Sequence, residues 1–89
     1  MSSEGDYSAV ADGQLDDLEQ GAAIDLYNAV LDVIELIFRA PGQAQFYSTA
    51  ITTAEGIRMR LPVPGFGDYK VFWSRSTDGP RVEAIFKHL

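Results

Sequence analysis

The sequence predicts a single α+β domain in which an N-terminal helical hairpin packs on an antiparallel sheet of three or four strands. Three observations predict this class. Residues 22–39 have apolar residues at helical spacing, residues 57–88 alternate between apolar and polar residues, and two short turns interrupt that alternation. The chain has 89 residues, of which 46% are hydrophobic, so we expect one core and one domain spanning residues 1–89.

The N-terminal segment predicts a short helix that follows a polar tail. Residues 1–6 are small and polar, and we expect them to be flexible. Residues 7–11 alternate weakly between larger and smaller side chains, which indicates a short strand ahead of the helices. Asp12 is a suitable N-cap, and the acids that follow it favour the positive end of a helix dipole. We therefore expect a helix over about 13–19 that ends at Gly21.

Residues 22–39 form the clearest helical pattern in the chain. They contain neither Gly nor Pro, and Pro41 and Gly42 are expected to end the helix. Apolar residues repeat at three- and four-residue steps on two adjacent stripes, which predicts a helix buried over more than half of its circumference. The stripes are Ile24, Tyr27, Leu31, Ile34 and Phe38, and Leu26, Val30, Val33 and Ile37.

Residues 43–55 are compatible with two different structures. They are rich in Ala, Thr and Ser, with few large apolar residues among them. One interpretation is a loop that contains a single helical turn. The other is a strand at about 46–52 that turns back near Glu55 and Gly56 and adds a fourth strand to the sheet.

The apolar period changes to two after Gly56, which predicts three strands joined by turns at residues 64–67 and 76–80. In the first two strands one face is apolar, whereas the third, Val82 to His88, is apolar on both faces. A three-stranded meander needs a helix over its apolar face, and residues 22–39 supply that helix. The inward sets are Ile57, Met59, Leu61 and Val63 in the first strand and Tyr69, Val71 and Trp73 in the second.

Charge is unevenly distributed along a chain whose formal net charge is −6. Residues 1–21 hold six acids and no base, whereas residues 57–89 hold six bases and three acids. The absence of cysteine and the single histidine argue against a disulfide scaffold and a metal site, and we expect no cofactor. No signal peptide and no apolar run of about 20 residues are present, so a cytoplasmic protein without membrane contact is expected.

The residues best suited to chemistry form a basic row on the expected outer face of the sheet. Arg58 and Arg60 are two residues apart on one strand and so share a face at ~7 Å, with Lys70 beside them. His88 joins that face if the register of the third strand directs it outward. Arginine binds phosphate in a bidentate manner, lysine can act as a base when its surroundings favour the neutral amine, and histidine can act as an acid.

These four residues, Arg58, Arg60, Lys70 and His88, are therefore the candidate catalytic residues for cleavage of an RNA phosphodiester. A simpler interpretation is also open. Outward basic side chains on a small sheet increase solubility, and lysine on a strand protects sheet edges against aggregation. Residue types alone do not decide between these two interpretations.

The last third of the chain and the order of its elements resemble the RelE/ParE superfamily of toxins from bacterial type II toxin–antitoxin systems. Members typically show a basic strand, a G-x-Y-R-aliphatic-aromatic-aromatic strand, a DG turn and a closing strand that ends in a basic residue or His. The two helices ahead of the sheet, with Pro41 just after the second, are also similar, and the resemblance covers roughly residues 7–89. The matching segments are GIRMRL at 56–61, GDYKVFW at 67–73, DG at 78–79 and VEAIFKH at 82–88.

The resemblance implies a helical hairpin on an antiparallel sheet, usually with a first strand near the N-terminus, and a cognate antitoxin protein as partner. Members that cleave mRNA on the ribosome place cations on the concave face of the sheet. By position, Arg58 and Arg60 match the basic strand, Lys70 matches the usual Arg, and His88 matches the terminal basic residue. The resemblance therefore implies a growth-inhibiting mRNA interferase, that is, an endoribonuclease.

Other members, the ParE branch, inhibit DNA gyrase and do not use these residues as a nuclease. Three features keep this alternative open: the pI of about 4.4, Lys70 in place of the usual Arg, and only Leu89 after His88 where several nucleases have a terminal Tyr or helix. A degenerate toxin that only binds a partner is a third alternative. Formation of a homodimer also stays open.

Overall fold

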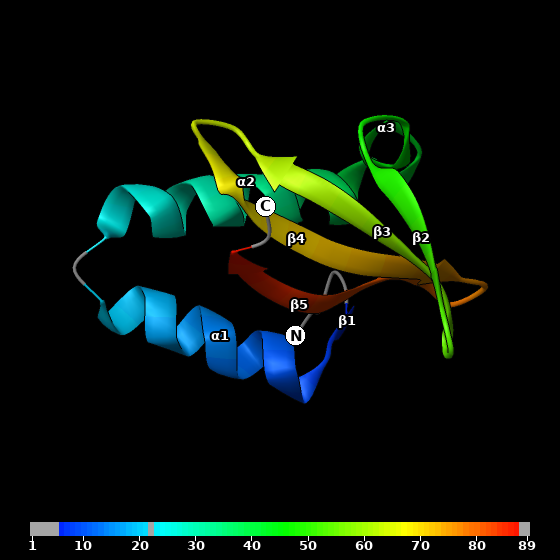
Figure 1. Ribbon diagram of the computed structural model, residues 1–89, viewed down its shortest axis with the longest axis horizontal. Coiled ribbons are helices and arrows are strands. Elements are labelled where there is room, and N and C mark those ends of the chain that lie inside the picture. The colour runs from blue at the N-terminus through cyan, green and yellow to red at the C-terminus, as the bar shows by residue number, and fades with distance from the viewer. Residues whose placement is uncertain (1–5, 22, 88–89) are drawn as a thin grey trace.

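The computed structural model describes residues 6–21 and 23–87. It confirms the predicted class, an α+β domain in which the N-terminal helices pack on the sheet (Figure 1). A short strand precedes the helices, and four longer strands follow them. In chain order the elements are β1 (Asp6–Tyr7), α1 (Ala9–Gln20), α2 (Ile24–Arg39), α3 (Pro41–Phe46), β2 (Thr49–Thr53), β3 (Gly56–Val63), β4 (Phe66–Ser76) and β5 (Gly79–Lys87).

The sheet has five strands in the order β1-β5-β4-β3-β2, rather than the three or four predicted. Strands β2 to β5 form an antiparallel meander, and β1 runs parallel to β5 with Tyr7 beside Val82. Both additional strands are edge strands. Strand β1 has only two residues, and β2 is the strand that was one of two interpretations of residues 43–55. Edge strands this short carry too little alternation to be counted with certainty from sequence.

Helix α1 begins earlier than predicted. Its N-cap is Ser8 rather than Asp12, and the Ser8 hydroxyl oxygen accepts a hydrogen bond of 3.0 Å from the Ala11 amide. The strand expected over residues 7–11 is therefore wrong beyond Tyr7, because the chain turns into the helix at Ser8. The predicted end of the helix is confirmed, with Gly21 as its C-cap.

The segment after α2 combines the two interpretations of residues 43–55. Helix α2 ends at Arg39, and Pro41 then occupies the start of α3, where its fixed backbone angle suits a first helical turn. This short helix supplies the expected helical turn, and the strand that follows it is β2. The loop interpretation is therefore incomplete, and the four-stranded alternative is closer to the structure.

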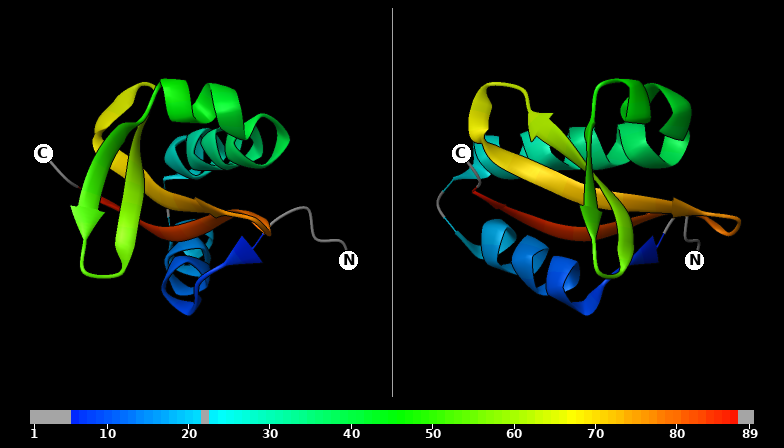
Figure 2. Two further views of the ribbon diagram at one scale, coloured as in Figure 1. Left: turned by 90° about the vertical axis from the view of Figure 1, so that its right-hand side faces the viewer. Right: turned by 45° about the vertical axis from the view of Figure 1, so that its right-hand side comes forward.

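The core lies between α2 and the inner face of the sheet (Figure 2). Trp73 is fully buried in it, as the alternation in β4 predicts. Ile57 is an exception to the predicted inward set, because it follows the β2–β3 turn directly and is 61% exposed. The buried residues of α2 and of β3 are Leu26, Val30, Val33, Ile34 and Ile37 of the helix and Met59, Leu61 and Val63 of the strand.

Strand β5 contains a β-bulge that the alternating pattern did not predict. Phe72 pairs with Ala84 and the next residue, Trp73, pairs with Val82, so β5 has one extra residue, Glu83, at this point. As a result Val82 and Ile85, three residues apart, are both buried. The predicted strict alternation through this strand is therefore wrong.

Helix α1 covers the edge of β5 that the short strand β1 leaves open. The Ser8 amide donates to the Val82 carbonyl at 2.9 Å, and the Ser8 hydroxyl donates to the Glu83 carbonyl at 2.5 Å. Further along, the Ile85 amide donates to the Gln14 side-chain oxygen at 2.5 Å. The N-cap Ser8, through its amide and its hydroxyl, and the side chain of Gln14 thus satisfy backbone groups that would otherwise face outward from this edge.

Candidate phosphate-binding face of the sheet

The face of the sheet turned away from α2 carries three of the four predicted site residues. Arg58 and Arg60 alternate with buried residues of β3, and Lys70 does the same in β4. In the register, Arg60 lies opposite Phe72 and Lys70 lies opposite Pro62. The three basic residues therefore share one face, with Lys70 one strand across from Arg60 and two residues along. We call this surface the outer face.

The basic side chains of the outer face are partly buried rather than fully extended into solvent. The Arg58 side chain is 23% exposed, and Arg60 and Lys70 also belong to the partly buried residues. The Lys70 ammonium donates a hydrogen bond to the Gly67 carbonyl, near the β3–β4 turn. The sheet therefore holds these cations close to its surface, where an anion lying on the outer face can reach them.

Glu83 also lies on the outer face, and the sequence did not indicate this. Its side chain is 18% exposed, and its Oε2 atom accepts a hydrogen bond of 2.7 Å from the Ser74 hydroxyl. Its Oε1 atom lies 3.9 Å from Nη2 of Arg58 and 3.9 Å from Nε of Arg81. The alternating pattern places Glu83 on the same side of the strand as Ile85, which is buried. The bulge in β5 directs Glu83 to the outer face instead, so the pattern gave no signal for this carboxylate.

Arg81 extends this charged network to the N-terminal strand. Its Nε atom lies 3.7 Å from Oδ2 of Asp6, which belongs to β1. A shallow hollow of about 250 Å³ lies beside these residues and is also lined by Ser74, Ser76 and Asp78. The network thus links Asp6, Arg81, Glu83 and Arg58 in that order, so acidic and basic side chains alternate. These residues belong to β1, β5 and β3.

The outer face therefore carries charges of both signs. Surface ion pairs at such distances each contribute at most about 1 kcal/mol and are screened by salt. A phosphate that approaches Arg58 has to compete with Glu83, which lowers the positive potential that the predicted basic row would otherwise have. Competition of this kind is compatible with binding, since a bidentate arginine–phosphate contact is stronger than a single long ion pair.

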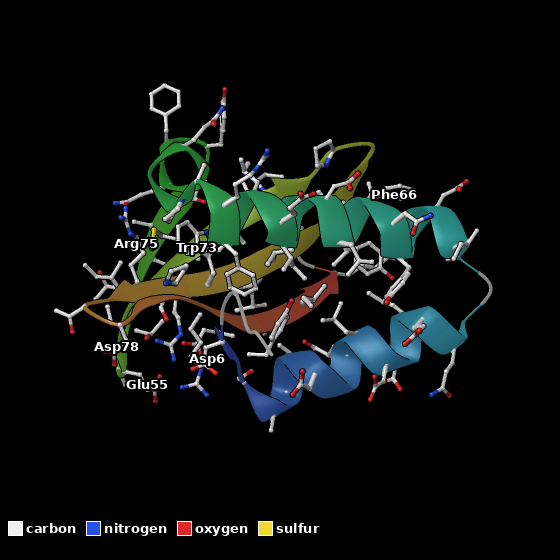
Figure 3. The ribbon with its side chains drawn as sticks, turned by 180° about the vertical axis from the view of Figure 1, so that it is seen from behind. Asp6, Glu55, Phe66, Trp73, Arg75 and Asp78 are labelled. Carbon is white, nitrogen blue, oxygen red and sulfur yellow. The ribbon has the colours of Figure 1, made fainter. Side chains whose placement is uncertain are left out.

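Arg75 belongs to a different polar cluster, between β4 and α3. Its Nη1 atom donates to the Gln45 side-chain oxygen at 2.7 Å. Nearby, the Trp73 indole N–H donates to the Ser48 hydroxyl at 3.1 Å, and that hydroxyl donates to the Ala44 carbonyl at 2.7 Å. Figure 3 shows Trp73 and Arg75 close together on this side of the molecule. The cluster fastens α3 to the sheet and lies apart from the outer face.

His88 lies outside the described residues, so its place beside the basic row stays a prediction. Within residues 6–21 and 23–87, no group of three His, Cys, Asp or Glu side chains is arranged to hold a metal ion. The helices in the same part of the chain are all too short or too polar to cross a membrane.

In comparisons with known proteins, no family model, no curated protein and no solved structure matches the chain.

Proposed function

We propose that this protein is the toxin of a bacterial type II toxin–antitoxin system and acts as an endoribonuclease on mRNA at the ribosome. The observation that carries the proposal is the outer face, where Arg58, Arg60 and Lys70 gather from two adjacent strands. The order of elements also supports it. One strand, a helical hairpin and an antiparallel meander are the arrangement that the RelE/ParE resemblance implies.

RNA cleavage by the attack of its own 2′-hydroxyl requires a base, an acid for the leaving oxygen and cations near the phosphorane charge. In this proposal Arg58 and Arg60 bind the scissile phosphate and stabilise the charge that develops on it. Lys70 acts in its neutral amine form and takes the 2′-hydroxyl proton, and His88 acts in its protonated form and gives its proton to the leaving oxygen. A cognate antitoxin would keep the toxin inactive in the growing cell.

Inhibition of DNA gyrase without nuclease activity is a second candidate, and one specific observation favours it. Glu83 lies between two arginines and reduces the positive potential of the outer face. The formal net charge of −6 further weakens attraction to RNA. On this candidate function, the purified protein inhibits supercoiling by gyrase and leaves transcripts intact.

Induced expression in bacteria, with primer-extension mapping of transcripts, separates the two candidates. The ribonuclease proposal predicts growth arrest and new 5′ ends in translated mRNAs, and it predicts that an Arg58→Ala/Arg60→Ala double variant loses both effects. Arg75→Ala is the matched control, because it removes a cation of the same sheet that lies away from the outer face. Growth arrest without new transcript ends, together with inhibited supercoiling, would support the gyrase candidate. Normal growth would contradict both.

A further inference from the structure

The two edges of the sheet are protected to very different degrees. At the β5 edge, β1, Ser8 and Gln14 satisfy outward backbone groups. At the opposite edge, β3 is the only strand that pairs with β2 among residues 6–21 and 23–87. The sequence of β2, TAITT, contains no charged residue, no proline and no glycine. Charges, proline, bulges and covering helices are the features that block edge pairing in other proteins, and β2 has no bulge in its register. Its alternate N–H and C=O groups therefore face outward and can pair with another strand.

The surroundings of β2 also favour association. The β2–β3 hairpin stands away from both long helices in Figure 2, so neither helix lies over this edge. Next to it, Phe46 is 82% exposed at the end of α3 and Ile57 is 61% exposed in β3. The acids of α1 lie at the other edge of the sheet, beside β5. Beside β2 itself, Glu55 of the β2–β3 turn is an acid, but it lies outside the strand Thr49–Thr53.

We propose that β2 pairs in antiparallel fashion with β2 of a second copy of this chain, about a two-fold axis at Ile51. Residues directly opposite each other in antiparallel strands face the same side, so such an axis must pass midway between the two copies of one residue. Ile51 is the central residue of β2, and only this register pairs all five residues. It places Thr49 opposite Thr53 and Ala50 opposite Thr52, without a charged pair. Opposed threonines stabilise neighbouring strands, so the strand is complementary to itself.

This pairing would join the outer faces of the two copies. Ile51 lies opposite Arg58 in the β2–β3 register, and so it belongs to the same face as Arg58. The two Arg58 residues would then stand three strand spacings apart, or roughly 14 Å, on one continuous sheet. The consequence for RNA binding rests on the proposed function, whereas the pairing itself does not.

Sedimentation velocity of the purified full chain from about 10 μM to about 1 mM tests the proposal. The expected result is a concentration-dependent rise from the 9.8 kDa monomer to twice that mass. Ile51→Glu and Ile51→Lys should each weaken association by about tenfold or more, because like charges then face each other across the axis. An equimolar mixture of the two variants should form a heterodimer, because the axis then carries opposite charges.

Thr52→Lys is the matched control, because it adds the same charge to the same strand but faces Ala50 of the second copy, so it should retain most of the association. Circular dichroism should show that each variant is folded. The carboxylate introduced by Ile51→Glu can pair with Arg58, which lies opposite position 51 in β3. Three results would overturn the proposal: a wild-type monomer over the whole range, equal effects of the position 51 and position 52 variants, or folded charge variants that do not form a heterodimer.

Discussion

Arg58 and Glu83 face each other across the outer face, with Nη2 and Oε1 3.9 Å apart, although β4 lies between their strands. Ser74 of that intervening strand donates a hydrogen bond to the other oxygen of the same carboxylate. Three strands thus contribute to one small network. The network holds Arg58, which the sequence predicts to bind phosphate. The Glu83 carboxylate competes with phosphate for this arginine.

The first prediction concerns this competing anion. Glu83→Gln removes a negative charge from the outer face and frees Arg58 and Arg81 for phosphate. We expect affinity for single-stranded RNA at low salt to rise by about three- to tenfold, with a steeper salt dependence. Fluorescence anisotropy over a salt series measures both quantities. Glu55→Gln, in the exposed β2–β3 turn, is the control for charge alone, and equal effects of the two variants would contradict the prediction.

The second prediction concerns Arg60. Arg60→Ala should lower RNA cleavage by about tenfold or more, as the loss of a cation that stabilises transition-state charge does in other enzymes. Its effect on stability should be within about 1 kcal/mol, because the residue lies on the surface face of the sheet. Cleavage rates and urea denaturation of the same protein sample separate the two effects. A fall in activity that merely follows a fall in stability would argue against a direct role.

The third prediction concerns the hydrogen bond between Trp73 and Ser48. Ser48→Ala leaves the buried indole N–H without its acceptor and should lower the free energy of unfolding by about 1–2 kcal/mol. Trp73→Ala removes the largest fully buried side chain and should cost about 3–5 kcal/mol. Urea denaturation measures both. Thr77→Ala, in an exposed turn, should change the value by less than about 0.5 kcal/mol.

The fourth prediction is a stabilising substitution in α1. Gly13 lies within the helix, and a Cβ atom added there meets nothing within 4 Å. Gly13→Ala should therefore raise the free energy of unfolding by about 0.5–1 kcal/mol. Gly65→Ala is the contrasting variant and should destabilise the protein, because the φ angle of +83° at Gly65 strains any L-residue with a side chain. Thermal and urea unfolding should move in opposite directions for the two variants.

Most of the core could be predicted from the sequence, because its pattern is carried by long elements. Helix α2 has two complete apolar stripes, and β3 and β4 alternate over many residues, so the inward positions of Met59 and Trp73 followed directly. Strands β1 and β2 were uncertain because they are short and lie at the edges. Ile57 was assigned to the core because alternation alone does not show where the covering helix ends.

The candidate site was only partly predictable, for a related reason. Arg58, Arg60 and Lys70 lie on regular strands, so a period of two was sufficient to place them on one face. Glu83 lies at a bulge, and the alternating pattern gave it the same side as Ile85, which is buried. A bulge depends on how β5 pairs with β4, and a single strand's sequence does not contain that information.

Cleavage of a translated mRNA in a purified translation system tests the central claim most directly. With wild-type protein, we predict cuts at defined positions that appear only when ribosomes translate the message. The Arg58→Ala/Arg60→Ala variant should produce no cuts, and Arg75→Ala should cut as the wild type does. Intact mRNA in the presence of active wild-type protein, or equal cleavage by the double variant, would contradict the account.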